Sequence, residues 1–200
     1  MNGPVTAAKL DETEAFYRAR GAPCSIELSP MADFSVPDLL TRRGYAITEF
    51  ANLLIRSMAA LAETPSAGVQ VIEAQSDEGE AWASVAARGF FEREEASEGE
   101  LEIGQAIFHA PSARAFFAAL DQQHAGVGAM AAAVLFADST LPRFRGRGVQ
   151  LALIGARLAA ARTAGAELAI ASTAPGSISQ RNYQRCGFEP AYTRITFQKS

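Results

Sequence analysis

The chain has 200 residues, 48% apolar and 20% charged, with a formal net charge of −4 at pH 7. These values fit one globular domain, or one domain and a fragment, and the acidic balance argues against nucleic acid as a partner. The first residues lack the features of a signal peptide, and no apolar run is long enough to span a bilayer. We therefore expect a cytoplasmic protein with no membrane partner. Cys24 and Cys186 fit reduced thiols, with a disulfide as the open alternative.

The N-terminal residues predict a helix, a strand and a second helix. Apolar periodicity indicates a helix over residues 5–19, and residues 24–28 read as a strand. The second helix is predicted to begin at a Ser35 cap, with Pro37 in its first turn and Asp38 in a position like that of a capping box.

Residues 45–57 predict one long strand or two short ones. Residues 63–68, which contain proline, serine and glycine, are the best candidate for a linker. We therefore expect two domains, over residues 1–64 and 65–200.

The middle of the chain predicts strands around two helices. Residues 69–74 are strand-like, and helices are expected over residues 79–95 and 100–110. The acidic residues of these helices predict a solvated face. Residues 115–120 fit either a strand or the end of a helix, and residues 121–128 predict a turn.

The last third of the chain alternates strands and helices. A short apolar run, residues 131–137, predicts a buried strand, and residues 151–162 are mostly strong helix formers. A strand over 168–172, a short helix over 179–186 and a terminal strand or strand pair over 188–198 follow.

The loop between that buried strand and the long helix predicts an anion site. The first N–H groups of a helix have no partner within the helix, and the helix dipole makes this end positive. Gly146 and Gly148 would let the backbone approach a phosphate, while Arg143, Arg145 and Arg147 would add positive charge. The alternative is an ordinary turn with three solvated arginines.

Two parts of the chain share one order of elements. A helix, a strand, a turn with proline and a second helix surround the pair Gly21 and Gly44, and the same order surrounds Gly165 and Gly187. Few identities accompany the agreement in spacing, so a degenerate repeat and coincidence between two ordinary units both remain open.

Two motifs carry a resemblance to a known family. The run around Arg145 and Gly148 resembles motif A of the GNAT superfamily of acyl-CoA N-acyltransferases, although position 150 is glutamine instead of a small residue. Residues 182–188, with Tyr183 ahead of Gly187-Phe188, resemble a second signature of that superfamily. Both motifs occur in the expected order.

The resemblance implies an α/β (α+β) GNAT fold. Its mixed central sheet would have two splayed parallel strands, here near 133–140 and 168–172, with flanking helices and an N-terminal GNAT-like half-repeat. It also implies an acetyl-CoA-dependent N-acetyltransferase in which a primary amine attacks the thioester directly. The residues expected to hold the cofactor are Leu141, Arg143, Arg145, Gly146, Arg147, Gly148, Val149, Gln150, Ser179, Asn182 and Tyr183.

The same resemblance places a general acid at Tyr183, which would protonate the departing thiolate. A core tyrosine is the alternative. Asp138, near the end of the central strand, is the best candidate for the base, ahead of His124 and Glu73. The two histidines lack companions with metal-ligand spacing, so no metal is expected.

The acceptor is expected to be a small-molecule or peptide amine. The residues expected to shape its pocket lie near 79–110 and 188–195. A homodimer is compatible with terminal strands at a sheet edge. Residues 126–131 match a dinucleotide-binding pattern, but no acidic residue follows at the required distance. The rival function is a GNAT-like sensor or scaffold that binds acyl-CoA without turnover.

Overall fold

A computed structural model describes residues 5–59 and 68–199, which form two compact units. The first unit includes the described chain up to Leu53 and from Pro190 onward, and the second covers Leu54 to Glu189. Strands β2 and β8 each pass from one unit into the other. The predicted domain boundary at 64/65 lies outside the described residues.

The first unit contains two helices and three strands. The helices are α1 (Ala7–Arg18) and α2 (Ser35–Arg42), and the strands are β1 (Cys24–Leu28), most of β2 (Ala46–Ser57) and most of β8 (Glu189–Lys199). Their hydrogen-bonded order is β1-β8-β2, with β1 antiparallel to β8. The helices and strands enclose a small core of Leu10, Cys24, Val36, Leu40, Tyr45 and Phe197.

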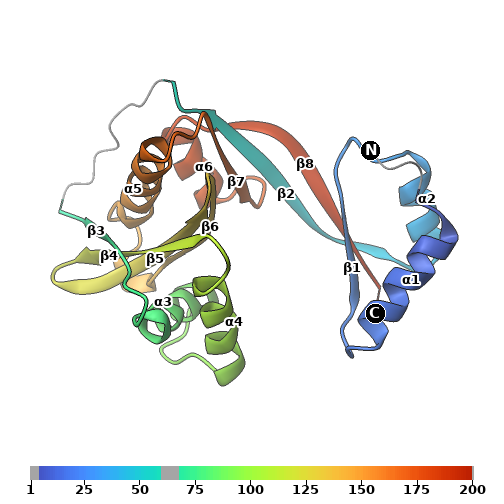
Figure 1. The fold of residues 1–200 in the computed structure, drawn as a ribbon, viewed down its shortest axis with the longest axis horizontal. Helices are drawn as coiled ribbons and strands as arrows, with labels where there is room; N and C mark the ends of the chain where they lie inside the picture. Colours follow the sequence, from blue (N-terminus) through green and yellow to red (C-terminus); the bar gives the residue numbers. More distant parts are fainter. Residues whose placement is uncertain (1–4, 60–67, 200) are drawn as a thin grey trace. The chain divides into compact units, whose positions relative to one another are not determined.

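The second unit is a mixed sheet with helices on both faces (Figure 1). Its strand order is β7-β6-β5-β4-β3, antiparallel from β3 to β6 and parallel between β6 and β7. Helices α3 and α4 cover one face, and α5 and α6 cover the other. The elements are β3 (Gln70–Glu73), α3 (Gly79–Phe91), α4 (Glu98–Phe108), β4 (Ala113–Leu120), β5 (Gln123–Ala131), β6 (Val134–Thr140), the short 3-10 helix η1 (Pro142–Phe144), α5 (Val149–Thr163), β7 (Leu168–Thr173) and α6 (Ile178–Arg185).

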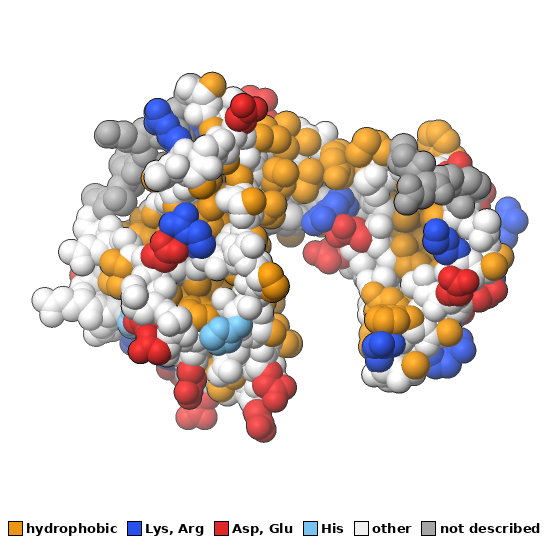
Figure 2. Space-filling view, in the orientation of Figure 1, with side chains coloured by type: hydrophobic (Ala, Val, Ile, Leu, Met, Phe, Trp, Pro, Cys, Tyr) orange, Lys and Arg blue, Asp and Glu red, His pale blue; other side chains and the backbone are white. Residues whose placement is uncertain are grey.

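Acidic side chains gather over the part of this unit that α3 and α4 form (Figure 2). Glu92, Glu94, Glu95, Glu98 and Glu102 are all exposed, as the sequence predicted for a solvated face. The Glu100 side chain, predicted to belong to the same face, is only 11% exposed and pairs with Arg93. A carboxylate in water costs little, so this cluster requires no ligand to explain it.

Three local predictions are wrong. The Asp33 carboxylate accepts hydrogen bonds from the N–H and hydroxyl of Ser35, so Ser35 does not cap α2. Residues 121–128, predicted as a turn, are mostly strand, and residues 131–137, predicted as one strand, contain the end of β5, the hairpin turn and the first part of β6. The hairpin turns at Ala132, whose φ is 51°. Alanine rarely adopts a positive φ, so the sequence does not predict a turn there.

Candidate functional site

The end of β6 is irregular on both of its edges. On one side, Val127 pairs with Ser139 and Ala129 with Phe136, so one residue of β5 faces two of β6. This is a β-bulge, with Ala137 at a φ of 54°. On the other side, β6 pairs with β7 only as far as Leu135 and Ala171, although both strands are described beyond that point. The predicted splay between the parallel strands is therefore present.

The loop after β6 leads into an uncapped helix. Gly146 and Gly148 have φ values of 74° and 80°, and Gly148 is the N-cap of α5 without a side-chain cap. The first helical bond is made by the N–H of Ala152 to the carbonyl of Gly148. In the described chain, no protein acceptor meets the N–H groups of Val149, Gln150 and Leu151. These donors are therefore open to an anion or to water.

The three loop arginines are partly engaged by the protein. Arg145 donates to the Glu92 carboxylate at 2.7 Å and to the Gly89 carbonyl at 2.9 Å, which ties the loop to the end of α3. Arg147 pairs with Asp121 at 2.9 Å, and the Arg143 guanidinium lies 4.9 Å from the Phe144 ring centroid. Much of the positive character of this loop therefore comes from its backbone N–H groups.

Gln150, which departs from the motif, connects α5 to α6. Its Nε2 donates to Ser179 Oγ at 2.9 Å, and its Oε1 accepts from Asn182 Nδ2 at 2.8 Å. Arg185 donates to Asn182 Oδ1 at 3.1 Å. A small residue at position 150 would lose these bonds, so the glutamine fixes the helix that carries Ser179 and Asn182.

A cavity of about 490 Å³, here called the loop cavity, lies against these groups. Of the predicted residues, it is lined by Asp138, Arg145, Gly146, Gly148, Val149, Gln150, Ser179 and Asn182. Four others do not line it: Leu141, Arg143, Arg147 and Tyr183. Leu141 is buried and donates its N–H to the Ala125 carbonyl. The sequence did not predict several residues that line the loop cavity, among them Gly89 and Phe90 of α3 and Glu92, which follows α3.

Asp138 lies at the centre of a buried polar cluster. Its carboxylate accepts hydrogen bonds from the Arg157 guanidinium on one oxygen and from the Tyr183 hydroxyl on the other. Arg157 is fully buried, Tyr183 is 1% exposed, and the Asp138 side chain is 13% exposed. Burial and the neighbouring Asp138 charge raise the pKa of Tyr183 well above its ordinary value. Tyr183 therefore stays protonated at neutral pH.

Arg157 also compensates for the bulge. Its Nη1 donates to the carbonyls of Ala129 and Phe136, at 3.0 and 3.2 Å, and its Nε donates to Leu153 at 3.0 Å. A Cβ at Gly128 would lie 2.8 Å from Arg157 Cζ, so a larger residue there would displace the guanidinium. The glycines of the dinucleotide-like pattern are thus packing positions within β5.

A signal for Arg157 was present in the sequence. It stands four residues after Leu153 and four before Ala161, both buried, so it shares the core-facing stripe of α5. The weaker candidates for the base are engaged elsewhere. Glu73 binds Arg114 through two bonds of 2.8 and 2.7 Å, which lowers the pKa of Glu73, and His124 packs against Phe117.

No family model and no curated protein matches the sequence, so the similarity to known proteins comes from comparison with solved structures. The chain is similar to a GCN5-related N-acetyltransferase from Kribbella flavida, with 22% identity, a TM-score of 0.74, and coverage of 98% of this chain and 77% of the other. It is also similar to a GCN5-related N-acetyltransferase from Sphaerobacter thermophilus, with 16% identity, a TM-score of 0.69, and coverage of 96% and 66%. The chain has the GNAT fold.

A third structure with the GNAT fold was solved with a ligand. It is AAC(6')-Iy in complex with the bisubstrate analogue CoA-S-monomethyl-acetylneamine, with 23% identity, a TM-score of 0.50, and coverage of 60% of this chain and 90% of the other. Among the described residues of this chain, no group of His, Cys, Asp or Glu could hold a metal. Within the same residues, no helix has the length and apolar character to cross a membrane.

Proposed function

We propose that this GNAT-fold chain is an N-acetyltransferase that moves an acetyl group from acetyl-CoA to a primary amine. The observation that carries the proposal is the uncapped N-terminus of α5, which faces the loop cavity beside the splayed ends of β6 and β7. The N–H groups of Val149, Gln150 and Leu151 fit the pyrophosphate of CoA. The unpaired edge of β6 would offer backbone donors to the thioester oxygen.

Acetyl-CoA supplies the activated acyl group: the amine nitrogen forms a bond to the carbonyl carbon, and the carbon–sulfur bond breaks. Asp138, which lines the loop cavity, is the proposed base for the ammonium proton. Its carboxylate forms an ion pair with Arg157. Tyr183 is the proposed acid for the departing thiolate.

The hydrogen bond between Tyr183 and Asp138 joins these two roles. We infer a relay in which Asp138 takes the proton that the attacking amine nitrogen loses, and the Tyr183 hydroxyl, which does not line the loop cavity in this structure, turns toward the thiolate and gives it a proton. Asp138 then passes its own proton to the Tyr183 oxygen. The proton lost by the amine thus ends on the sulfur, and both side chains return to their starting state. Arg157 holds Asp138, and through it the pair of Asp138 and Tyr183, in position.

The proposed acceptor is a small-molecule or peptide amine. AAC(6')-Iy, which shares the fold, was captured with a CoA–neamine bisubstrate analogue, which supports a small amine as the acceptor class. Both cysteines are buried, and a CoA-dependent enzyme with such thiols fits the cytoplasm. A homodimer stays a proposal.

The first experiment measures CoA and acetyl-CoA binding by isothermal titration, with two matched glycine variants. Gly148→Ala and Gly165→Ala both place a Cβ at a φ near 80°, and neither Cβ meets an atom within 4 Å. They lie at opposite ends of α5, so they carry similar backbone strain. We expect Gly148→Ala to weaken CoA binding by about tenfold or more, because its donors are displaced, and Gly165→Ala to leave it unchanged.

An amine panel with thiol-release detection then separates the two candidate functions. Turnover with any primary amine supports the enzyme. CoA binding by the wild type without turnover across the panel favours the sensor or scaffold. No CoA binding by the wild type, or equal weakening by both glycine variants, would contradict the proposed pyrophosphate site.

A further inference from the structure

A second cavity, here called the apolar cavity, lies between α3, α4 and β6. Its volume is about 200 Å³, far more than the roughly 10–15 Å³ that a single water needs. Its walls include Trp82, Ala86, Phe90, Ile103 and Ile107, with Gly104 where α4 approaches α3 closely.

The polar side chains that line the apolar cavity are each engaged by the backbone or by side chains outside the cavity. Glu100 accepts from the Ser97 N–H at 2.8 Å and from Arg93. Ser139 Oγ donates to the Ala86 carbonyl at 2.8 Å, and Asp138 is held by Arg157 and Tyr183. The walls therefore favour a hydrocarbon group, because a polar ligand would lose hydration without finding matching partners.

The apolar cavity adjoins the loop cavity and shares lining residues with it. Phe90, Asp138 and Ser139 line both, and Asp138 and Ser139 lie at the bulged end of β6, where the proposed function places the thioester. A chain attached to the thioester carbonyl would meet the apolar cavity directly. An acetyl group carries one methyl and leaves most of that volume unused.

We propose that the apolar cavity binds the acyl chain of the donor, so that the protein takes straight-chain acyl-CoA thioesters longer than acetyl-CoA. This inference rests on the proposed function, because it assumes CoA in the loop cavity. Burial of each added methylene predicts a gain of about fourfold in affinity until the cavity is filled.

The test titrates CoA, acetyl-CoA, butyryl-CoA and hexanoyl-CoA into the wild type, without an acceptor. The matched variants are Ala86→Phe, which fills the apolar cavity from a position that does not line the loop cavity, and Ala81→Phe, on the exposed face of the same helix. We expect affinity to rise with chain length in the wild type and in Ala81→Phe. In Ala86→Phe, acetyl-CoA should bind as before while the gain from longer chains disappears.

A second variant guards against misfolding of Ala86→Phe. Ile103 lines the apolar cavity but is 62% exposed, so the Ile103→Asn variant should fold. It should weaken the binding of hexanoyl-CoA more than that of acetyl-CoA. Equal affinity for all thioesters, or the same gain in Ala86→Phe, would overturn the inference; an apolar acceptor would then be the better occupant. CoA binding with no chain-length effect defeats only this inference, whereas no CoA binding defeats the proposed function as well.

Discussion

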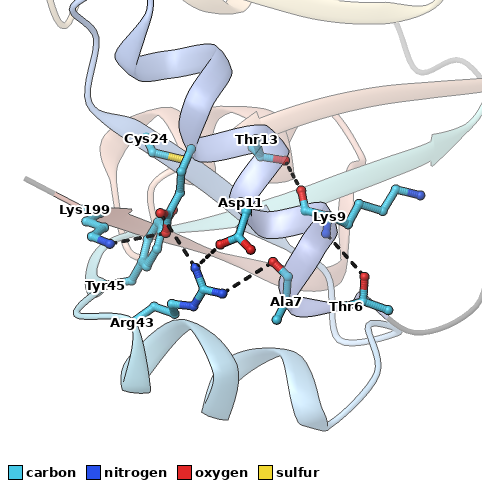
Figure 3. Close-up of polar contacts among 10 residues, drawn as sticks. Thr6, Ala7, Lys9, Asp11, Thr13, Cys24, Arg43, Tyr45 and Lys199 are labelled. Carbon is cyan, nitrogen blue, oxygen red and sulfur yellow. Dashed lines mark hydrogen bonds and ion pairs between the residues drawn. The ribbon is translucent and has the colours of Figure 1, made fainter.

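Each unit of the molecule contains a buried tyrosine whose hydroxyl meets a carboxylate next to cations. In the first unit, Tyr45 Oη lies 3.3 Å from Glu14 Oε1 and 3.0 Å from Cys24 Sγ (Figure 3). Lys199 donates to Glu14 at 3.3 Å, and Arg43 binds Asp11. In the second unit, Tyr183 meets Asp138, and Arg157 balances the charge.

The difference lies in what surrounds the two clusters. Asp138 lines both cavities, whereas neither cavity includes a residue of the Glu14–Tyr45 cluster. The cations of the first cluster are partly exposed, while Arg157 is fully buried. The same three chemical groups therefore belong to a small core in one unit and lie next to a cavity in the other, where we propose that they transfer a proton.

The sharpest test of this contrast removes each hydroxyl. Tyr183→Phe should lower turnover by about 10²–10⁴-fold, because the relay loses its acid, with CoA affinity retained. Tyr45→Phe should leave turnover unchanged. Steady-state rates with the best amine of the panel, together with a CoA titration, measure both. Full turnover by Tyr183→Phe would place it with Tyr45 as a structural residue.

Removing the buried cation should produce the largest change in stability. Arg157→Met leaves the Asp138 charge uncompensated, which costs about 3–5 kcal/mol of unfolding free energy. Arg43→Met, at a solvated pair, should cost much less. Urea denaturation at pH 7 gives both values. Similar losses in the two variants would mean that burial does not distinguish the clusters.

The fit of Arg157 against β5 predicts a smaller loss. Gly128→Ala should cost about 1–3 kcal/mol, because its Cβ would overlap the guanidinium. Gly99→Ala, in α4, meets nothing within 4 Å and should be neutral or stabilising. Denaturation midpoints compare the pair. An unchanged midpoint in Gly128→Ala would show that Arg157 has room to move.

The smallest effect concerns alkaline pH. Burial, and then the bond to Cys24, raises the pKa of Tyr45 above the ordinary value of about 10. The folded form therefore holds this proton more tightly, so its contribution to stability is full below about pH 10 and is lost as the pH rises above that value. Tyr45→Phe should make the alkaline fall in unfolding free energy shallower by about one proton. An unchanged slope would contradict the tight binding of that proton.

Local sequence signals predicted the positions of most helices and strands. Strong helix formers predicted α5, and Gly146 and Gly148 predicted a backbone that other residues avoid. The predicted order of helix, strand, helix and strand also recurs, as α1-β1-α2-β2 and α5-β7-α6-β8. One feature that could not be predicted depends on a distant residue, since Arg145 meets Glu92 from 53 positions away. Another is local: the hairpin turns at Ala132, a residue type that is not typical of a turn with positive φ.

The contact between Gly128 and Arg157 also constrains how this protein can diverge. A side chain at position 128 would displace the Arg157 guanidinium from its present contacts, whereas a shorter residue at position 157 would leave room for it. Loss of the arginine would in turn leave the carbonyls at the bulge without this donor, and the Asp138 carboxylate with Tyr183 as its remaining side-chain donor. The two positions should therefore covary among homologous sequences, as a pair inherited or replaced together.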